Sequence, residues 1–301
     1  MTKASLAIRK AVIPVAGLGT RLLPATKSQP KEMLPVGRKP VVQYVVEEMA
    51  QAGIRQICFV TGRSKRAIED HFDRDEELIA SLAASGSYAL IEELAYEKLD
   101  VHFFYTRQSV PLGLADAIGH AAEFVGNEPF VVALGDTIIY SRHDVGLLAR
   151  LIEVHQRRGA AATIALEEVD PDEVHRYGIV RPVGEGEDFP ISELVEKPRR
   201  DAAPSRLAIA ARYVFSADIF EAIRRTLTDT QGELQLTDAI RVLLAQGQPV
   251  WGVRLRPGER RYDIGNFETY FRAFVELAAV DEKYGYLVRQ HIHYLADGGL
   301  V

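Results

Sequence analysis

The sequence has a single cysteine, Cys58, so no disulfide bond can form within the chain. Cys58 lies in the apolar segment "IRQICFVTG", which favours a small buried side chain over a nucleophile. The sequence also lacks any apolar run near the ~20 residues that a membrane span needs. Arg9 and Lys10 interrupt the first apolar run, which is too short for the core of a signal peptide. We therefore expect a cytoplasmic protein with no membrane partner.

An excess of positive charge is missing as well. The formal net charge is -6, so the chain as a whole does not attract nucleic acid, and phosphate binding must come from local clusters of Arg and Lys. The eight histidines show no metal-binding spacing such as H-E-x-x-H, and we interpret them as solvated or structural. A composition of 47% hydrophobic and 26% charged residues indicates a globular protein.

Segments of strand length alternate with segments of helical period as far as Asp136. In the first predicted helix, 40–53, Val42, Val45, Val46 and Met49 form one apolar face. Strands that are almost wholly apolar and joined by helices indicate a parallel sheet covered on both faces, an α/β, Rossmann-like architecture. Strands are expected at 10–17, 54–62, 101–108 and 128–136, and a second helix at 113–126.

The pattern becomes mixed after Asp136. A long helix is expected over 143–159, and it is followed by short strand-like segments at 161–169, 177–183, 190–198 and 207–215. We therefore expect a mostly parallel, mixed sheet with a smaller mixed part. Near the end, helical spacing predicts a C-terminal helix that packs on its own domain or on a partner subunit; the residues concerned are Phe267, Tyr270, Phe271 and Phe274.

The stretch "AGLGTRLLPATKSQPKEMLPV" directly follows the first predicted strand. Gly17 and Gly19 would let backbone N–H groups approach a phosphate closely. A Rossmann dinucleotide site is excluded because Leu22 stands where a third glycine is needed, and no G-K-[ST] follows to complete a P-loop. Composition alone leaves Arg21 and Lys31 in an ordinary loop with solvated cations.

The order of residues in this stretch is more specific than its composition. The string G-x-G-T-R-L-x-P-x-T-x-x-x-P-K-E-M-L-P resembles the signature of the sugar-1-phosphate nucleotidylyltransferases, and among them the bacterial UTP–glucose-1-phosphate uridylyltransferases. Further segments follow in the order of that family: "RQSVPLGLADA", "LGD", "RYGIV", "VEKP", "LAIAARYVFSADIF", "GELQLTDAI" and "YDIGN". The resemblance thus covers almost the whole chain.

The resemblance implies a Mg²⁺-dependent, direct in-line displacement in which glucose-1-phosphate attacks the α-phosphorus of UTP. The products are UDP-glucose and pyrophosphate, and no covalent enzyme intermediate is required. It implies a single nucleotidyltransferase domain, 1–301, with a nucleotide-binding half (1–140), a sugar-phosphate-binding half (141–265) and a C-terminal helical extension (266–301). The partners would be the two small-molecule substrates, and the chain would form a homodimer or homotetramer.

The resemblance also assigns the nucleotide site. Arg21 would contact the triphosphate and the leaving pyrophosphate through forked hydrogen bonds, and Lys31 would steady the α-phosphate as a compact charge. Gln108 would bond the pyrimidine edge. The nucleotide-binding residues would be Ala16, Gly17, Leu18, Gly19, Thr20, Arg21, Lys31, Glu32, Gln108 and Gly113, and the catalytic residues Arg21, Lys31, Asp136 and Lys197.

Metal and sugar-phosphate residues follow from the later motifs. Asp136 and Asp263 would hold Mg²⁺, which binds one or two carboxylates together with substrate phosphates. Lys197 would neutralise the phosphate of glucose-1-phosphate, Glu196 would accept hydrogen bonds from sugar hydroxyls, and Gly178 would let the sugar lie against bare backbone. Without the resemblance, a strand-ending Asp is often only a turn former and "EKP" only a surface loop.

Two departures from the family pattern leave alternatives open. "GLADA" stands where the uridylyltransferases usually have G-L-G-H-A, and it is similar to the form in glucose-1-phosphate thymidylyltransferases, which use dTTP. An apolar pocket distinguishes uracil from thymine by only ~1–3 kcal/mol, because the bases differ by one methyl group. Phe267 stands where relatives have Lys, whose charge this chain either lacks or supplies from Arg260 or Arg261.

A third alternative is a catalytically silent nucleotide-sugar sensor. The joint presence of the expected cations and carboxylates argues against it, because a sensor could lose the metal ligands and still bind. In the run "RRYD", 260–263, we expect a solvated cationic edge apart from Asp263.

Overall fold

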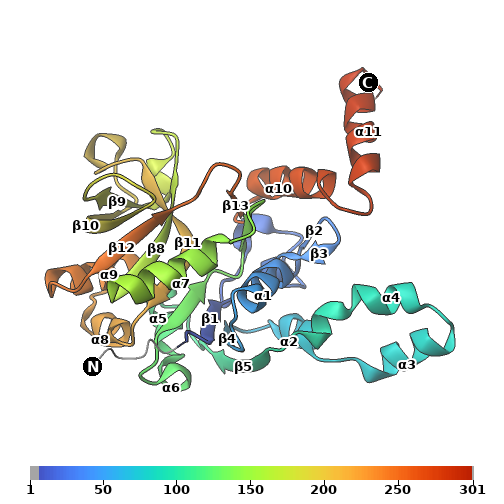
Figure 1. Ribbon diagram of the computed structural model, residues 1–301, viewed down its shortest axis with the longest axis horizontal. Helices are drawn as coiled ribbons and strands as arrows, with labels where there is room; N and C mark the ends of the chain where they lie inside the picture. Colours follow the sequence, from blue (N-terminus) through green and yellow to red (C-terminus); the bar gives the residue numbers. More distant parts are fainter. Residues whose placement is uncertain (1–6, 300–301) are drawn as a thin grey trace.

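The computed structural model describes residues 7–299; residues 1–6 and 300–301, which fall within the expected domain range, lie outside the described part. One nine-stranded sheet runs across the molecule in the order β5-β4-β1-β6-β11-β8-β12-β10-β9 (Figure 1). Its strands are β1 (Lys10–Pro14), β4 (Gln56–Thr61), β5 (His102–Arg107), β6 (Phe130–Ala133), β8 (Ala162–Glu168), β9 (Gly178–Pro182), β10 (Asp188–Glu196), β11 (Leu207–Phe215) and β12 (Val250–Arg254).

The strand directions confirm the predicted α/β class with a mixed sheet. In the first half, β5, β4, β1 and β6 are all parallel. β11 then runs antiparallel to both β6 and β8, and β10 runs antiparallel to β12 and β9. Parallel pairing therefore prevails only in the first half, where each strand is followed by a helical crossover.

Two short ribbons lie outside the main sheet. β2 (Pro35–Val36) pairs with β3 (Lys39–Pro40), and β7 (Thr137–Tyr140) pairs antiparallel with β13 (Arg260–Asp263). The second ribbon joins the segment after β6 to a segment near the end of the chain.

Helices cover both faces of the sheet, and each layer has its own apolar core. Successive residues of β1 alternate between them: Val12 faces one core, and Ala11 and Ile13 face the other. One face is covered by α1 (Val41–Gln51), α2 (Arg66–Phe72) and α7 (Leu147–Arg158). The opposite face is covered by α5 (Leu114–Gly119), α6 (Ala122–Val125), α8 (Asp218–Arg225) and α9 (Leu236–Ala245).

The predicted helices are mostly present, with shifted ends. The apolar face of α1 is fully buried, as its spacing predicted. The helix predicted over 113–126 is broken into α5 and α6, and the one predicted over 143–159 begins only at Leu147. Cys58 is buried, and burial raises the pKa of its thiol to about 11, which confirms its prediction as a small buried side chain.

Four further helices extend from this body. α3 (Glu76–Ala84) and α4 (Tyr88–Glu93) form a hairpin that projects from the sheet, in a segment where no helix was predicted (Figure 1). The predicted C-terminal helix is two helices, α10 (Phe267–Ala279) and α11 (Gly285–Ala296). Phe267 and Tyr270 pack on the body, whereas Phe271 and Phe274 remain 59% and 37% exposed.

Candidate active site

The parallel strands β1 and β6 lie side by side and end at the same edge of the sheet. The glycine loop follows β1, and Asp136 follows β6, so both lie at the carboxyl edge where open α/β sheets bind ligands. Gly19 accepts a hydrogen bond at its carbonyl oxygen from the Thr26 hydroxyl, at 2.7 Å. This bond closes the loop back onto the turn that carries Lys31.

Lys31 and Asp136 form an ion pair in which the ammonium donates to the carboxylate. Burial by itself lowers the pKa of Lys31, but the carboxylates of Asp136 and Glu32 outweigh it and hold the pKa above its usual range. For Asp136, burial raises the pKa and the Lys31 charge lowers it, with a net shift downwards. Both groups are therefore charged over the whole physiological pH range.

Asp263 is brought to Asp136 by the pairing of β13 with β7. In that register Asp263 lies opposite Thr137, and the Ile264 N–H donates to the Asp136 carbonyl at 2.9 Å. Burial and the negative charge of Asp136 raise the pKa of the Asp263 carboxyl. Arg21 and Asp263 also meet beside Gly265, so the predicted phosphate-binding cation lies at the predicted metal carboxylates.

These two carboxylates are a donor set that suits a hard divalent cation. Carboxylate oxygens are the ligands that Mg²⁺ prefers, and Mg²⁺ is usually bound by one or two of them together with waters and substrate phosphates. Within residues 7–299 no cluster of three or more His, Cys, Asp or Glu side chains could hold a metal ion. The arrangement therefore fits an ion shared with a phosphate ligand and not one enclosed by protein.

A buried ion pair supports the turn before α1. The Glu32 carboxylate accepts a hydrogen bond from Lys65 at 2.8 Å, and the two side chains are only 2% and 7% exposed. Burial raises the pKa of Glu32, against the lowering effect of Lys65 and Lys31. Lys65 was not predicted from the sequence, because a single Lys far from the motif carries no local signal.

A cavity of about 240 Å³ lies beside Lys31 and Asp136. The glycine loop and the "GLADA" segment both line it, so residues from two separate predicted motifs surround the same space. The predicted nucleotide residues in its lining are Ala16, Gly17, Lys31, Glu32, Gln108 and Gly113. Leu18, Gly19, Thr20 and Arg21 lie on the adjoining loop, outside this lining.

Gln108 is nearly fully buried at the end of β5. Its side-chain amide donates two hydrogen bonds, to the Asp116 carboxylate at 2.7 Å and to the Gly113 carbonyl at 3.2 Å. Gly113 has a φ of 101°, and a Cβ there would lie 2.6 Å from the carbonyl oxygen of Leu234. The turn at position 113 therefore requires glycine on both grounds.

The predicted sugar-phosphate residues form a second group. Gly178 lies opposite Glu196 in the β9–β10 register, and Glu196 accepts a hydrogen bond from the Thr237 hydroxyl at 2.6 Å. A Cβ at position 178 would lie 3.2 Å from the Glu196 carboxylate and 3.1 Å from the Thr237 hydroxyl. The Lys197 side chain is 57% exposed and lies 3.5 Å from Glu196. Thr237 is a further member that the sequence did not predict.

No hydrogen bond or ion pair within residues 7–299 joins the second group directly to Lys31, Asp136 or Asp263. Arg261 and Tyr177 connect the two groups. The Arg261 guanidinium lies 4.5 Å from the centre of the Tyr177 ring and is among the charges that act on Asp263. The Tyr177 carbonyl accepts a hydrogen bond from the Lys197 N–H at 3.0 Å.

The expectation that 260–263 is a solvated cationic edge is therefore wrong for Arg261. Its side chain is buried, pairs with Glu167 and lies over the Tyr177 ring. Arg260, the preceding residue on the strand, is exposed and pairs with Glu276 at 2.7 Å. Phe267 packs in the apolar cluster beneath α10, and Arg261 is among the charges that lower the pKa of Asp263.

Arg212 is another functional neighbour that the sequence did not single out. It is fully buried in β11, pairs with Glu48 at 2.7 Å and donates to the Thr137 carbonyl at 2.9 Å. These bonds fix the backbone just after Asp136. A lone Arg inside the otherwise apolar strand "LAIAARYVF" was the available signal, because a buried charge must be paired.

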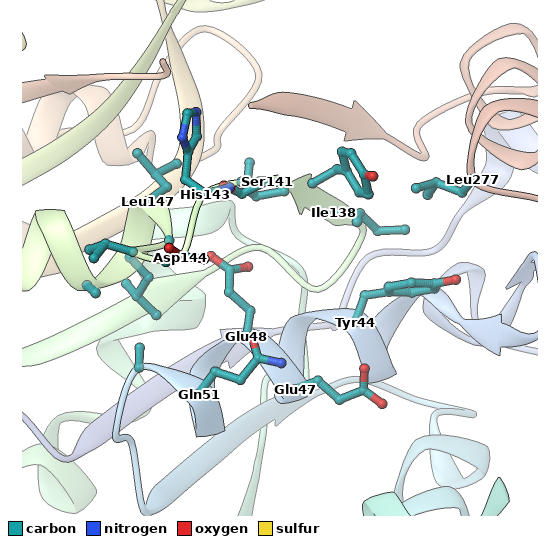
Figure 2. A pocket seen from close by; sticks show the side chains of 17 residues that line it. Tyr44, Glu47, Glu48, Gln51, Ile138, Ser141, His143, Asp144, Leu147 and Leu277 are labelled. Atoms are coloured by element: carbon teal, nitrogen blue, oxygen red, sulfur yellow. The ribbon is translucent and has the colours of Figure 1, made fainter. Parts of the chain in front are cut away.

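A second cavity, of about 390 Å³, lies between α1 and the segment that follows β6 (Figure 2). Glu47 and Glu48 of α1 and Asp144 make its lining acidic. It contains none of the residues predicted for the site, and an acidic lining does not suit polyphosphate ligands. The cavity beside Lys31 is therefore the candidate active site.

Comparisons with known proteins agree over most of the chain. Residues 10–280 match the model of the family described as nucleotidyl transferase. The chain is 46% identical over 276 residues to UTP–glucose-1-phosphate uridylyltransferase 2 of Staphylococcus saprophyticus subsp. saprophyticus, which covers 91% of this chain and 93% of the relative.

Two solved structures are similar to this chain. One is a UTP-bound UGPase from Acinetobacter baumannii, with a TM-score of 0.88, 37% sequence identity, and coverage of 96% of this chain and 100% of that one. The other is a UDP-glucose pyrophosphorylase complexed with UDP-glucose, with a TM-score of 0.81, 36% identity, and coverage of 90% and 98%. The similarity thus extends over 90–96% of this chain.

Proposed function

The chain belongs to the nucleotidyl transferase family, and from this premise we propose that it transfers a uridylyl group from UTP to glucose-1-phosphate. The observation that carries the proposal is the meeting of the glycine loop, Lys31, Asp136 and Asp263 at one edge of the sheet, beside a cavity that Gln108 also lines. The named activity of the 46% identical relative supports the choice of substrates.

In this reaction an oxygen of the sugar phosphate attacks the α-phosphorus of UTP. A new phosphorus–oxygen bond forms to glucose-1-phosphate, and the bond from the α-phosphorus to the bridging oxygen breaks. Pyrophosphate leaves with the bonding electrons, and UDP-glucose remains. The protein forms no covalent bond to either substrate. Its task is therefore to position two polyanions and to stabilise charge as it spreads over the phosphoryl oxygens.

Arg21 and Lys31, the cations beside Asp136 and Asp263, would make most of the contacts with the phosphates. Arg21, whose side chain is exposed beside Asp263, would clamp the triphosphate and the leaving pyrophosphate. Lys31 would move from Asp136 towards the α-phosphate when the nucleotide binds. The backbone of Ala16–Thr20 would approach the nucleotide, and Glu32 would hold the Lys31 turn through its bond to Lys65.

Asp136 and Asp263 would hold a divalent cation, and we propose Mg²⁺. When bound, Mg²⁺ would neutralise charge on the phosphate oxygens of the substrate. The chain contributes the two carboxylates, and the Arg212 bond to the Thr137 carbonyl keeps the backbone beside Asp136 in place.

The second group would bind glucose-1-phosphate. Glu196, oriented by Thr237, would accept hydrogen bonds from sugar hydroxyls, and the absence of a side chain at Gly178 would leave room beside it. Lys197 would neutralise the sugar phosphate, since it is the exposed cation of this group.

The proposal extends to organisation and assembly. The chain would act as one domain whose nucleotide half is 1–140 and whose sugar-phosphate half is 141–265, with 266–301 as a helical extension. Exposed aromatic residues on both C-terminal helices, among them Phe271, Tyr286 and Tyr294, support association into a homodimer or homotetramer. Within residues 7–299 no helix is long and apolar enough to cross a membrane.

The direct test is pyrophosphate release from the purified protein with glucose-1-phosphate and Mg²⁺, comparing UTP with dTTP at equal subsaturating concentrations. We expect a clear preference for UTP. A preference for dTTP would favour a thymidylyltransferase instead. Absence of release with either nucleotide, and with other hexose-1-phosphates, would leave a catalytically silent sensor.

A further inference from the structure

Asp116 fixes the orientation of the Gln108 side chain. The Gln108 Nε2 lies 2.7 Å from an Asp116 carboxylate oxygen and 3.2 Å from the Gly113 carbonyl oxygen. The Gln108 side chain is also nearly fully buried, which leaves its amide little room to rotate. These contacts couple the end of β5 to the first turn of α5.

The chemistry of the two partners decides which end of the amide faces them. A carboxylate and a backbone carbonyl can only accept hydrogen bonds, so the NH₂ group of Gln108 must point at them. With Nε2 facing Asp116 and Gly113, both N–H donors are engaged. The amide oxygen is then the one atom of this side chain left to interact with a ligand in the cavity that Gln108 lines.

We propose that Asp116 is a positioning residue that presents Gln108 to the nucleotide base as a hydrogen-bond acceptor. The inference rests on the proposed function, in which Gln108 meets the pyrimidine edge. Uracil and thymine carry a donor, the N–H at ring position 3, whereas cytosine has an acceptor at the same position. The site therefore selects bases of the uracil type over cytosine.

The energetic basis is the cost of leaving polar groups unpaired. With cytosine in the same place, the amide oxygen would face a ring nitrogen that cannot donate, and both acceptors would lose their water without gaining a bond. Sites built to bond a substrate N–H can reject analogues that lack it by several orders of magnitude. For a cavity that is partly open, we expect a preference for UTP over CTP of at least ~100-fold.

The neighbours of Asp116 leave its hydrogen bond with Gln108 in place. A titratable neighbour is His120, whose Nε2 lies 3.5 Å from the same Asp116 carboxylate oxygen and whose side chain is 41% exposed. If a hydrogen-bond donor took the place of the Asp116 carboxylate or of the Gly113 carbonyl, the Gln108 amide would have to turn. The "GLADA" form of the motif thus has a specific consequence for base recognition.

The test is direct binding of UTP and CTP to the full-length protein by isothermal titration calorimetry, without the sugar phosphate. The variants are Asp116→Asn and Asp116→Ala, with Glu123→Gln as a matched control, since Glu123 is an exposed carboxylate on the neighbouring α6. Asparagine is nearly isosteric and can face Gln108 with either its oxygen or its NH₂, so both amide orientations become populated.

We expect each Asp116 variant to lower the UTP-to-CTP affinity ratio by ~10-fold or more, and the control to retain it. A wild-type ratio in a folded Asp116→Asn variant would overturn the inference, as would a wild-type protein that binds both nucleotides equally or neither. Selective UTP binding that depends on Asp116, without pyrophosphate release, would overturn the proposed function alone. The KM for glucose-1-phosphate should be unchanged, which a general loss of structure would not allow.

Discussion

At the scale of single residues, Asp136 has the most consequences. Its negative charge is attracted by the Lys31 ammonium and repelled by the second carboxylate, Asp263. Asp136→Asn keeps the size of the side chain and removes the charge, and the fold should remain intact. We expect turnover to fall by at least ~100-fold, because the site loses one charge that stabilises the transition state.

Pyrophosphate release measured across a Mg²⁺ titration checks this prediction, with Asp144→Asn as the control because Asp144 lines the other cavity. Near-normal turnover of Asp136→Asn at saturating Mg²⁺ would rule out the metal assignment. An unchanged circular dichroism spectrum would show that the loss is chemical and not structural.

Lys197 is the corresponding residue of the sugar-phosphate group. Its ammonium lies 3.5 Å from the Glu196 carboxylate, its charge also acts on Asp229, and the side chain stays largely exposed, so it is available to a phosphate. Lys197→Ala should raise the KM for glucose-1-phosphate by ~10-fold or more while leaving UTP binding unchanged, because one charge-assisted contact contributes about 1.5–3 kcal/mol.

Separate titrations of the two substrates make the comparison. Arg199→Ala serves as the control, since Arg199 is a neighbouring exposed cation that pairs with Asp201 at 3.3 Å. Equal losses for both substrates in Lys197→Ala would remove Lys197 from the sugar-phosphate role.

At the scale of secondary-structure elements, the start of α5 links the cavity to α9. Gly113 has positive φ, and its Cα faces the backbone of Leu234, which itself bonds the Leu112 carbonyl at 2.7 Å. Gly113→Ala adds a collision with the Leu234 backbone to the cost of a conformation, φ 101° and ψ 175°, that is essentially restricted to glycine. We expect a loss of about 2–4 kcal/mol in the free energy of unfolding and a weakened Gln108 contact.

Urea denaturation measures this loss. Gly159→Ala is the matched control: Gly159 ends α7 with a φ of 57° and has no atom within 4 Å of the added Cβ. That variant should lose only about 1 kcal/mol, the conformational cost alone. Equal losses in the two variants would show that the contact with Leu234 is unimportant.

At the scale of the whole molecule, one buried histidine makes stability depend on pH. His155 of α7 lies 3.2 Å from the Thr163 hydroxyl of β8, where the helix layer meets the sheet. Burial lowers the pKa of His155 to about 4, below the ~6.5 of an unfolded chain. Between these values the unfolded state binds more protons than the folded state, so stability falls as the pH falls from 6.5 to 4.

The expected size is about 3 kcal/mol over that interval, because each unit of pKa shift corresponds to about 1.4 kcal/mol. His155→Gln cannot titrate, so the stability difference between wild type and variant should shrink by about this amount as the pH is lowered. Urea denaturation at pH 7.5, 6 and 4.5 measures it, with His175→Gln, an exposed histidine, as control. Parallel stability curves for wild type and His155→Gln would contradict the prediction.

The sequence by itself determined the features that depend on neighbouring residues. The apolar face of α1 follows from its helical period of 3.6 residues, and β1, β4 and β6 follow from short continuous apolar runs, since strands covered on both faces are apolar throughout. The glycine loop, Gln108 and Asp136 were predicted from motifs whose residues are close together in the sequence. The α3–α4 hairpin escaped prediction because neither helix has a buried residue that would mark a face.

Only the tertiary structure decided which of these residues meet. Asp263 reaches Asp136 through the pairing of β13 with β7, and that same register turns Arg261 inward to Glu167. Asp116 takes the Gln108 amide only because β5 ends against the first turn of α5. The partners in such contacts come from different elements, and their proximity is set by strand register and by how the layers pack. No local pattern in the sequence encodes that proximity, because it depends on the pairing of the whole sheet.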